Sequence, residues 1–141
     1  TSLPGFDGQI IDGLGLVEVS TIVNAAPRSV GELVVEPSND ELPILTGFEN
    51  HQGLTKLGVG VNPLGKVISG VGNGFDRVEG VWQGNIIGTY MHGPVLARNP
   101  ELADALIQSA TKETLKPFAD IWADQFALER RTSLLTSKIH K

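Results

Sequence analysis

Cysteine is absent from the 141 residues of the chain. This absence excludes a disulfide scaffold, a metal site built on thiolates and a cysteine nucleophile supplied by the chain itself. Methionine occurs once, at Met91, and the first residue is Thr1. We therefore expect the chain to be part of a longer polypeptide.

Long apolar runs and large basic patches are also missing. No window approaches the roughly 18 continuous apolar residues of a membrane-spanning helix, and we expect no signal peptide. The net charge is −5, and we interpret the two small basic clusters, Arg130 with Arg131 and Lys138 with Lys141, as solvated surface. The composition, 40% hydrophobic and 19% charged, indicates a soluble globular domain, and we expect no nucleic-acid partner and no membrane span.

Glycine is confined to the first two thirds of the chain, since all 17 glycines precede residue 94. This shift predicts one domain over residues 1–141, strand-rich at about 1–93 and helical at about 99–135. Residues rich in β-branched side chains predict strands at 16–23 and 29–35. Residues 43–48 and 54–61 form a second predicted pair around a loop at 49–53. Residues 77–82 and 85–91 form a predicted hairpin around Gln83 and Gly84.

Two helices are predicted in the last third. Asn99 is a good N-cap residue, Pro100 suits the first helical position, and Glu101 faces the positive end of the helix dipole. Four apolar residues then mark a buried face at helical spacing: Leu102, Ala105, Leu106 and Ala110. A second helix is predicted at 118–135. We interpret its apolar stripe as core packing rather than as a ligand platform: Phe118, Ile121, Trp122 and Phe126.

His92 is the most informative candidate for chemistry. It ends a predicted strand in residues 88–94 (GTYMHGP), and Pro94 prevents that strand from continuing. The carboxyl end of a strand is where α/β enzymes place their sites. The alternative is a histidine that merely caps the strand by hydrogen bonding.

Other polar candidates are less specific. Glu49, Asn50 and His51 could polarise a substrate or orient a loop, or they could be turn chemistry between two strands. A metal site of Glu49, His51 and His92 is conceivable, but its spacing matches no ligand pattern. Arg28 is either a surface residue or a clamp for a carboxylate. Residues 70–74 (GVGNG) lack the Lys-Ser/Thr of a phosphate-binding loop, so we expect neither a metal nor a cofactor.

Three segments taken together resemble one family: residues 12–21 (DGLGLVEVST), 47–55 (GFENHQGLT) and 88–100 (GTYMHGPVLARNP). In this order and spacing they are similar to the glutamine amidotransferase domain of the cobyric acid synthase (CobB/CobQ) type. Within that family the likeness is closest to the glutaminase subunit of lipid II isoglutaminyl synthase, a cell-wall amidating enzyme. The resemblance extends from about residue 6 to residue 107.

The resemblance implies a class I glutamine amidotransferase-like α/β fold, a flavodoxin-like three-layer sandwich. This chain would form its C-terminal part, a mixed β-sheet followed by two C-terminal helices. It also implies a Cys–His glutaminase, in which a thiolate attacks the carboxamide of glutamine. The ammonia would pass to a Mur-ligase-like ATP-dependent synthetase subunit.

The family pattern implies roles for several residues. His92 matches the catalytic histidine, which would hold the cysteine as thiolate, protonate the leaving ammonia and activate the hydrolytic water. Arg28 matches a position that holds the substrate, since a guanidinium pairs well with the α-carboxylate of glutamine. Glu49, Asn50 and His51 belong to the family signature, and we assign them to loop architecture before chemistry.

Two departures from the family pattern limit these roles. Relatives of this fold carry an acid two residues after the histidine, where this chain has Pro94. The orienting carboxylate is therefore absent, or it comes from elsewhere in the domain or from the partner. The family's cysteine lies upstream of the matching region. We therefore expect the chain alone to be inactive and to require an N-terminal half that carries the nucleophile.

The expected function is amidation of the D-glutamate of lipid II during peptidoglycan synthesis, in the cytoplasm. Amidation of cobyric or cobyrinic acid in cobalamin biosynthesis is an alternative, because it uses the same glutaminase module. A non-catalytic interaction module is a second alternative, because the chain has no cysteine nucleophile.

Overall fold

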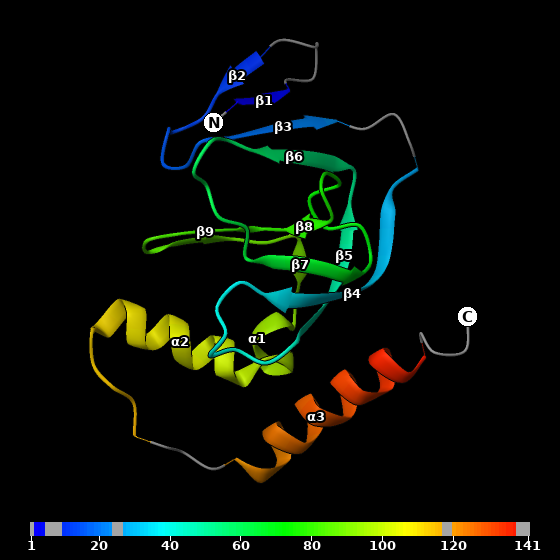
Figure 1. Ribbon diagram of the computed structural model, residues 1–141, viewed down its shortest axis with the longest axis vertical. Helices are drawn as coiled ribbons and strands as arrows, with labels where there is room; N and C mark the ends of the chain where they lie inside the picture. Colours follow the sequence, from blue (N-terminus) through cyan, green and yellow to red (C-terminus); the bar gives the residue numbers. More distant parts are fainter. Residues whose placement is uncertain (1, 5–9, 24–26, 117–119, 138–141) are drawn as a thin grey trace.

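The computed structural model describes residues 2–4, 10–23, 27–116 and 120–137 (Figure 1). Strands fill the first part of the chain, and helices follow. The strands are β1 (Ser2–Pro4), β2 (Ile10–Asp12), β3 (Val19–Val23), β4 (Ser29–Pro37), β5 (Leu45–His51), β6 (Gly53–Leu57), β7 (Gly65–Ser69), β8 (Val78–Glu79), β9 (Val81–Gln83), β10 (Ile86–Gly88) and β11 (Met91–His92). The helices are α1 (Val95–Arg98), α2 (Pro100–Thr111) and α3 (Ile121–Thr136).

Two sheets and a hairpin organise the strands. The larger sheet has the order β11-β5-β4-β7-β8 and is antiparallel throughout. The other sheet has the order β2-β1-β3-β6 and is mixed, because β1 runs parallel to β3 while its other pairs are antiparallel. The helices lie on the side of the larger sheet away from β3 and β6 (Figure 1). The chain therefore has the predicted α/β architecture, a mixed sheet followed by C-terminal helices.

The prediction of a loop at residues 49–53 is wrong. β5 continues through residues 49–51, and Gln52 alone separates it from β6. The two strands do not form a pair, because β5 pairs with β4 and β11 whereas β6 pairs with β3. The turn-forming residues at this position therefore carry the chain around a corner from one sheet into the other.

The other predicted strands are present with changed bounds. The first begins at Val19 rather than at residue 16, and the second continues to Pro37. The predicted hairpin is confirmed as β9 and β10, with its turn at Gly84 and Asn85. The strand predicted at 77–82 is interrupted at Gly80, whose φ of 60° ends β8 and redirects the chain into β9.

The hydrophobic core lies where one face of the larger sheet meets the β9–β10 hairpin and α2. Its buried members are Leu33, Val35, Leu42, Leu45, Leu64, Val67, Met91 and Leu102. Each fully buried side chain of this size stabilises the fold by about 1.5–3 kcal/mol. Gly47 is necessary here, because an added Cβ would lie 2.6 Å from Cβ of Met91. The core thus attaches the short strand β11 to β5.

α2 begins at Pro100, as predicted, but Asn99 does not cap it with its side chain. The Asn99 carboxamide instead bonds the backbone of Thr46 on β5 and the carbonyl oxygen of Val95. Leu102 is buried, and Ala105 and Leu106 pack against the core. The predicted buried face ends there, because Ala110 is exposed.

The prediction that the apolar stripe of the last helix packs in the core is wrong. Ile121, Trp122 and Phe126 are exposed on α3, and Phe118 lies outside the described residues. The arginines predicted to be solvated face inward instead, Arg130 toward Glu32 and Arg131 toward Glu101. Lys138 and Lys141 lie outside the described residues. In the part of the chain that the structure describes, no helix has both the length and the apolar character needed to cross a membrane.

Candidate functional site

His92 lies on the edge strand of the larger sheet. β11 pairs with β5 in the register Met91↔Glu49 and His92↔Phe48. Successive side chains of a strand point to opposite faces, so Met91 enters the core while His92 is on the other face, where it is exposed. The chain then leaves the strand through Gly93 and Pro94 and enters α1. The imidazole thus lies at an open rim of the sheet, at the end of a strand, as predicted.

Arg28 and Asn50 meet on the same side of the sheet. Arg28 immediately precedes β4, and the register Val30↔Asn50 places it beside the end of β5. Its Nε donates to Oδ1 of Asn50 at 2.5 Å, and its Nη2 donates to the backbone oxygen of Asn50 at 3.1 Å. Two of the three guanidinium nitrogens hold this contact, and because Arg28 is exposed, its third nitrogen can bind an anion.

The two parts of this rim share one sheet face. His92, Phe48 and Asn50 have the same orientation, because His92 is directly opposite Phe48 and Asn50 lies two residues further along β5. Diagonal neighbours of this kind are about 7–8 Å apart. Val30, opposite Asn50 on β4, is 59% exposed. On this face a strip of sheet formed by the half-buried residues Phe48 and Asn50 connects the imidazole with Arg28.

Glu49 and His51 point to the opposite, buried face. Oε1 of Glu49 accepts from the backbone N–H of Val71 at 2.8 Å, and Oε2 accepts from that of Gly72 at 2.9 Å. Nε2 of His51 lies 3.2 Å from the same Oε2, and its Nδ1 lies 2.9 Å from the carbonyl oxygen of Gly53. Both side chains therefore hold backbone segments in place, and the sheet separates them from His92.

Tyr90 connects this buried pair to the second sheet. Its ring stacks on His51, with ring centroids 3.9 Å apart and planes inclined by 21°. Its hydroxyl lies 2.7 Å from Oγ1 of Thr55 on β6, which lies 2.8 Å from Oγ1 of Thr21 on β3. Tyr90, which directly precedes β11, is thus held by His51 on one sheet and by Thr55 on the other.

Glu79 is a buried residue that the sequence analysis missed. Its Oε1 accepts from the hydroxyl of Thr89 at 2.5 Å and from the backbone N–H of Tyr90 at 2.7 Å. Oγ1 of Thr89 in turn accepts from the N–H of Met91 at 2.9 Å. Burial raises the pKa of the Glu79 carboxyl, and the bonds from Thr89 and Tyr90 oppose this shift in part. No sequence signal marks the position, since a Glu before a glycine is typical of exposed turns.

The structure does not assemble the conceivable metal site of Glu49, His51 and His92. In the ranges described above, no cluster of three or more His, Asp and Glu side chains could hold a metal ion. What remains at the rim is an exposed imidazole, a guanidinium and a carboxamide. The imidazole can exchange protons, and the guanidinium can bind a carboxylate.

Comparison with known proteins identifies the family. The chain matches the model of the CobB/CobQ-like glutamine amidotransferase domain over residues 4–100. It is 37% identical, over 129 residues, to the lipid II isoglutaminyl synthase (glutamine-hydrolyzing) subunit GatD of Streptococcus pneumoniae, a match that covers 86% of this chain and 49% of the relative. It is 36% identical over 133 residues to the subunit of the same name in Staphylococcus aureus, covering 88% of this chain and 53% of the relative.

A third relative belongs to the other branch that the sequence resembles. The probable cobyric acid synthase of Methanosphaera stadtmanae is 36% identical over 90 residues, which cover 59% of this chain and 18% of that protein. The chain spans about half the length of the two lipid II isoglutaminyl synthase subunits that it matches. Because the domain model covers more than half of its residues, the chain belongs to the CobB/CobQ-like glutamine amidotransferase family.

Proposed function

We propose that this chain supplies the histidine side of a glutaminase that releases ammonia from glutamine for an ATP-dependent synthetase. The observation that carries the proposal is the exposed imidazole of His92 at the rim of the larger sheet. It is the group that a Cys–His glutaminase needs within reach of a thiol. Because the chain has no cysteine, that thiol comes from another segment, and this chain by itself is inactive.

The chemistry assigns three steps to His92. In the first, the imidazole takes the proton of the cysteine, and the thiolate adds to the side-chain carbonyl carbon of glutamine. In the second, the imidazolium returns a proton to the departing nitrogen, so that ammonia leaves and a thioester remains. In the third, the imidazole accepts a proton from the water that attacks the thioester carbon; the C–S bond breaks, the proton passes to the departing sulfur, and glutamate and the cysteine thiol are released. An exposed, edge-strand position allows the ring to face both sulfur and water.

Arg28 holds the substrate in this proposal. A guanidinium binds the α-carboxylate of glutamine through charge-assisted hydrogen bonds. Its bonds to Asn50 orient it on the same sheet face as His92. The carboxylate would thus be anchored at one end of the strip formed by Phe48 and Asn50, and the carboxamide presented at the other. The group that orients His92 comes from another part of the domain or from the partner, because position 94 is proline.

The acceptor that we propose is the D-glutamate of lipid II, amidated in the cytoplasm by a Mur-ligase-like synthetase subunit. Support comes from the extent of the matches. Those to the two lipid II isoglutaminyl synthase subunits cover 86% and 88% of this chain, whereas the match to the cobyric acid synthase covers 59%. The larger shared region includes helical residues beyond the end of the domain model at residue 100.

Replacement of His92 by alanine in the complete enzyme tests the proposal. General acid–base catalysis by one side chain contributes about 10²–10⁴-fold, so we expect glutamine hydrolysis to fall by at least this factor. The melting temperature should not change, because the side chain is exposed. Gln83→Ala, at the exposed end of β9, is the control. Glutamine turnover near the wild-type rate in His92→Ala would remove the imidazole from the mechanism and support a non-catalytic interaction module.

A further inference from the structure

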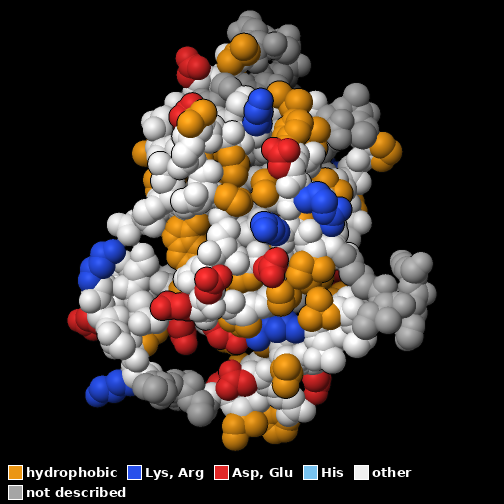
Figure 2. All heavy atoms as spheres, viewed as in Figure 1, with side chains coloured by type: hydrophobic (Ala, Val, Ile, Leu, Met, Phe, Trp, Pro, Cys, Tyr) orange, Lys and Arg blue, Asp and Glu red, His pale blue; other side chains and the backbone are white. Residues whose placement is uncertain are grey.

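Glu79 is a fully buried carboxyl that the steps proposed for His92 do not use. The acidic side chains visible in Figure 2 lie at the surface, where water solvates them, whereas none of Glu79 is exposed. Burying a carboxyl is unfavourable unless hydrogen bonds replace the lost water. Among the described residues, Glu79 receives such bonds through Oε1 alone, and its Oε2 has no partner. What the carboxyl contributes must therefore lie in the contacts of one oxygen.

The contacts of this oxygen hold the chain segment that leads into the His92 strand. Oε1 accepts from the hydroxyl of Thr89 at 2.5 Å and from the N–H of Tyr90 at 2.7 Å. Thr89 and Tyr90 are the two residues between β10 and β11, and we call them the β10–β11 link. Oγ1 of Thr89 also accepts from the N–H of Met91, the first residue of β11, at 2.9 Å. One carboxyl therefore orders the whole link and, through Thr89, the start of the strand.

The strand β11 is short enough to depend on this link. It has only the two residues Met91 and His92, and it lies at the edge of the larger sheet, where it pairs with β5. A strand of this length shares few backbone hydrogen bonds with its neighbour. Its position therefore depends on how the chain enters it, and the last bond before His92 is the one from the Met91 N–H to Thr89.

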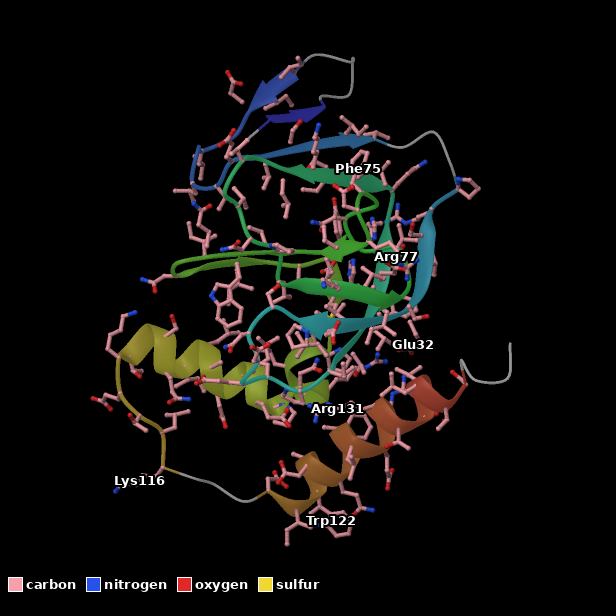
Figure 3. All side chains as sticks on the ribbon, viewed as in Figure 1. Glu32, Phe75, Arg77, Lys116, Trp122 and Arg131 are labelled. Carbon is pink, nitrogen blue, oxygen red and sulfur yellow. The ribbon has the colours of Figure 1, made fainter. Side chains whose placement is uncertain are left out.

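The segment around β8, from which the carboxyl extends, is itself held in place. Arg77, labelled in Figure 3, precedes β8 and donates from Nη2 to the backbone oxygen of Val67 on β7 at 3.0 Å. After β8, the carboxamide of Asn73 bonds the backbone oxygen and N–H of Gly80 at 2.9 Å and 2.7 Å. An added Cβ on Gly80 would lie 2.3 Å from the backbone oxygen of Gly88, so the two backbones are in contact. The carboxyl thus reaches the link from a fixed base.

We propose that Glu79 is a positioning residue for glutamine hydrolysis, whose carboxyl fixes the β10–β11 link so that the imidazole of His92 stands at one place on the rim. The inference rests on the proposed function, because it takes His92 as the group that exchanges protons with thiol and water. Glu79 acts through the backbone, since its hydrogen bonds go to the link and not to the imidazole. A displacement of about 1 Å at a reacting group can lower a rate about 10²-fold, so a small shift of β11 is sufficient.

The position of the oxygen, rather than its charge, is what this role requires. Burial raises the pKa of the Glu79 carboxyl, so a neutral side chain of the same length suits the site. Glu79→Gln keeps that length and an oxygen that accepts from Thr89 and Tyr90. Glu79→Asp keeps the carboxyl but is one methylene group shorter, so its oxygen is withdrawn from both donors. Glutamine should therefore replace Glu79 better than aspartate does, the reverse of what a role for the negative charge would give.

The test measures glutamine hydrolysis by the complete enzyme, with each variant kept below its melting temperature. Glu79→Asp and Thr89→Val should each lower kcat about 10–100-fold. KM should not change, because neither variant touches Arg28, and kcat and kcat/KM should fall together. Glu79→Gln and Thr89→Ser keep the oxygens and should have kcat near the wild-type value. Leu42→Ala is the control for stability, because it removes a buried side chain between β4 and β5 and should lower the melting temperature without changing kcat.

Hydrogen exchange at the N–H groups of Tyr90 and Met91 reports on the anchoring independently of activity, and it should be faster in Glu79→Asp and Thr89→Val. Three outcomes would overturn the inference: wild-type kcat in both of these variants, an equal loss of kcat in Leu42→Ala, or an equal loss in Glu79→Gln and Glu79→Asp. Turnover retained in His92→Ala would overturn the proposed function, while faster exchange in Glu79→Asp would still show that the carboxyl anchors β11. An inactive His92→Ala beside a fully active Glu79→Asp would overturn the inference alone.

Discussion

The carboxamide of Asn99 pairs with the backbone of Thr46 in both directions. Its Oδ1 accepts from the Thr46 N–H at 2.9 Å, and its Nδ2 donates to the Thr46 oxygen at 2.8 Å and to that of Val95 at 2.7 Å. Asn99 and Thr46 are both fully buried. The side chain therefore continues the hydrogen-bond pattern of β5 in the manner of an added strand, and it joins the helical part of the chain to the larger sheet.

Asn99→Ala should be strongly destabilising. The substitution leaves the N–H and oxygen of Thr46 buried without these bonds, and each unsatisfied group costs about 1–3 kcal/mol. We expect the free energy of unfolding to fall by roughly 2–4 kcal/mol in urea titrations. Asn62→Ala, at an exposed position in the connection between β6 and β7, should change it by less than about 0.5 kcal/mol. A similarly small loss in Asn99→Ala would show that the bonds contribute little.

Glu79 should make stability depend on pH. Its pKa is raised above the ordinary 4.5 by burial. A carboxyl of this kind contributes stability that is fully present below the unfolded pKa and is lost as pH rises through the folded pKa. Glu79→Gln cannot titrate, so the wild type should lose stability relative to this variant as pH rises from about 4.5. Parallel pH curves, or an equal change in Glu36→Gln at an exposed position, would refute the argument.

Gly47→Ala should displace the His92 strand. An added Cβ would lie 2.6 Å from Cβ of Met91, which is close to the backbone and cannot swing away. We expect a loss of about 1–3 kcal/mol in stability and a lower rate of glutamine hydrolysis in the complete enzyme. Gly93→Ala is the control for stability, because nothing lies within 4 Å of its added Cβ. Unchanged melting in Gly47→Ala would show that β11 can shift without cost.

Arg28→Lys should raise KM for glutamine more than it lowers kcat. Lysine keeps the charge but loses the planar donors that bind a carboxylate and Asn50 together. We expect a rise in KM of about 10–100-fold, the signature of an interaction made equally in the ground state and transition state. Arg77→Lys, an exposed arginine in the turn before β8, should leave KM unchanged. An unaltered KM in Arg28→Lys would show that the guanidinium does not bind the substrate.

Local sequence patterns predicted which helices and strands form better than they predicted what each side chain contacts. The start of α2 at Pro100 and the β9–β10 hairpin follow from residue types with strong backbone preferences. Asn99 shows the limit, because an asparagine before Pro100 has the same pattern whether it caps the helix or binds a distant strand. The residue that it binds is 53 positions away, and nothing in the sequence near Asn99 specifies that contact.

The orientation of α3 shows a second limit. Helical spacing places Ile121, Trp122 and Phe126 on one side of α3 but does not say which side faces the protein. That choice depends on Glu32 and Glu101, which lie on β4 and α2 and receive the two arginines. The candidate site divides in the same way. The position of His92 at a strand end was predictable, whereas the buried contacts of Glu49 and Glu79 depend on strand register.

Gln52 is the one-residue connection between the two sheets, and its shortness couples the sheets. A single residue separates β5 from β6, and Nδ1 of His51 contacts the carbonyl oxygen of Gly53 across this connection. The layer that contains β3 and β6 is therefore joined directly to β5, which pairs with the His92 strand β11. We therefore expect a chain segment that packs on β3 to affect the position of the imidazole through β6 and β5.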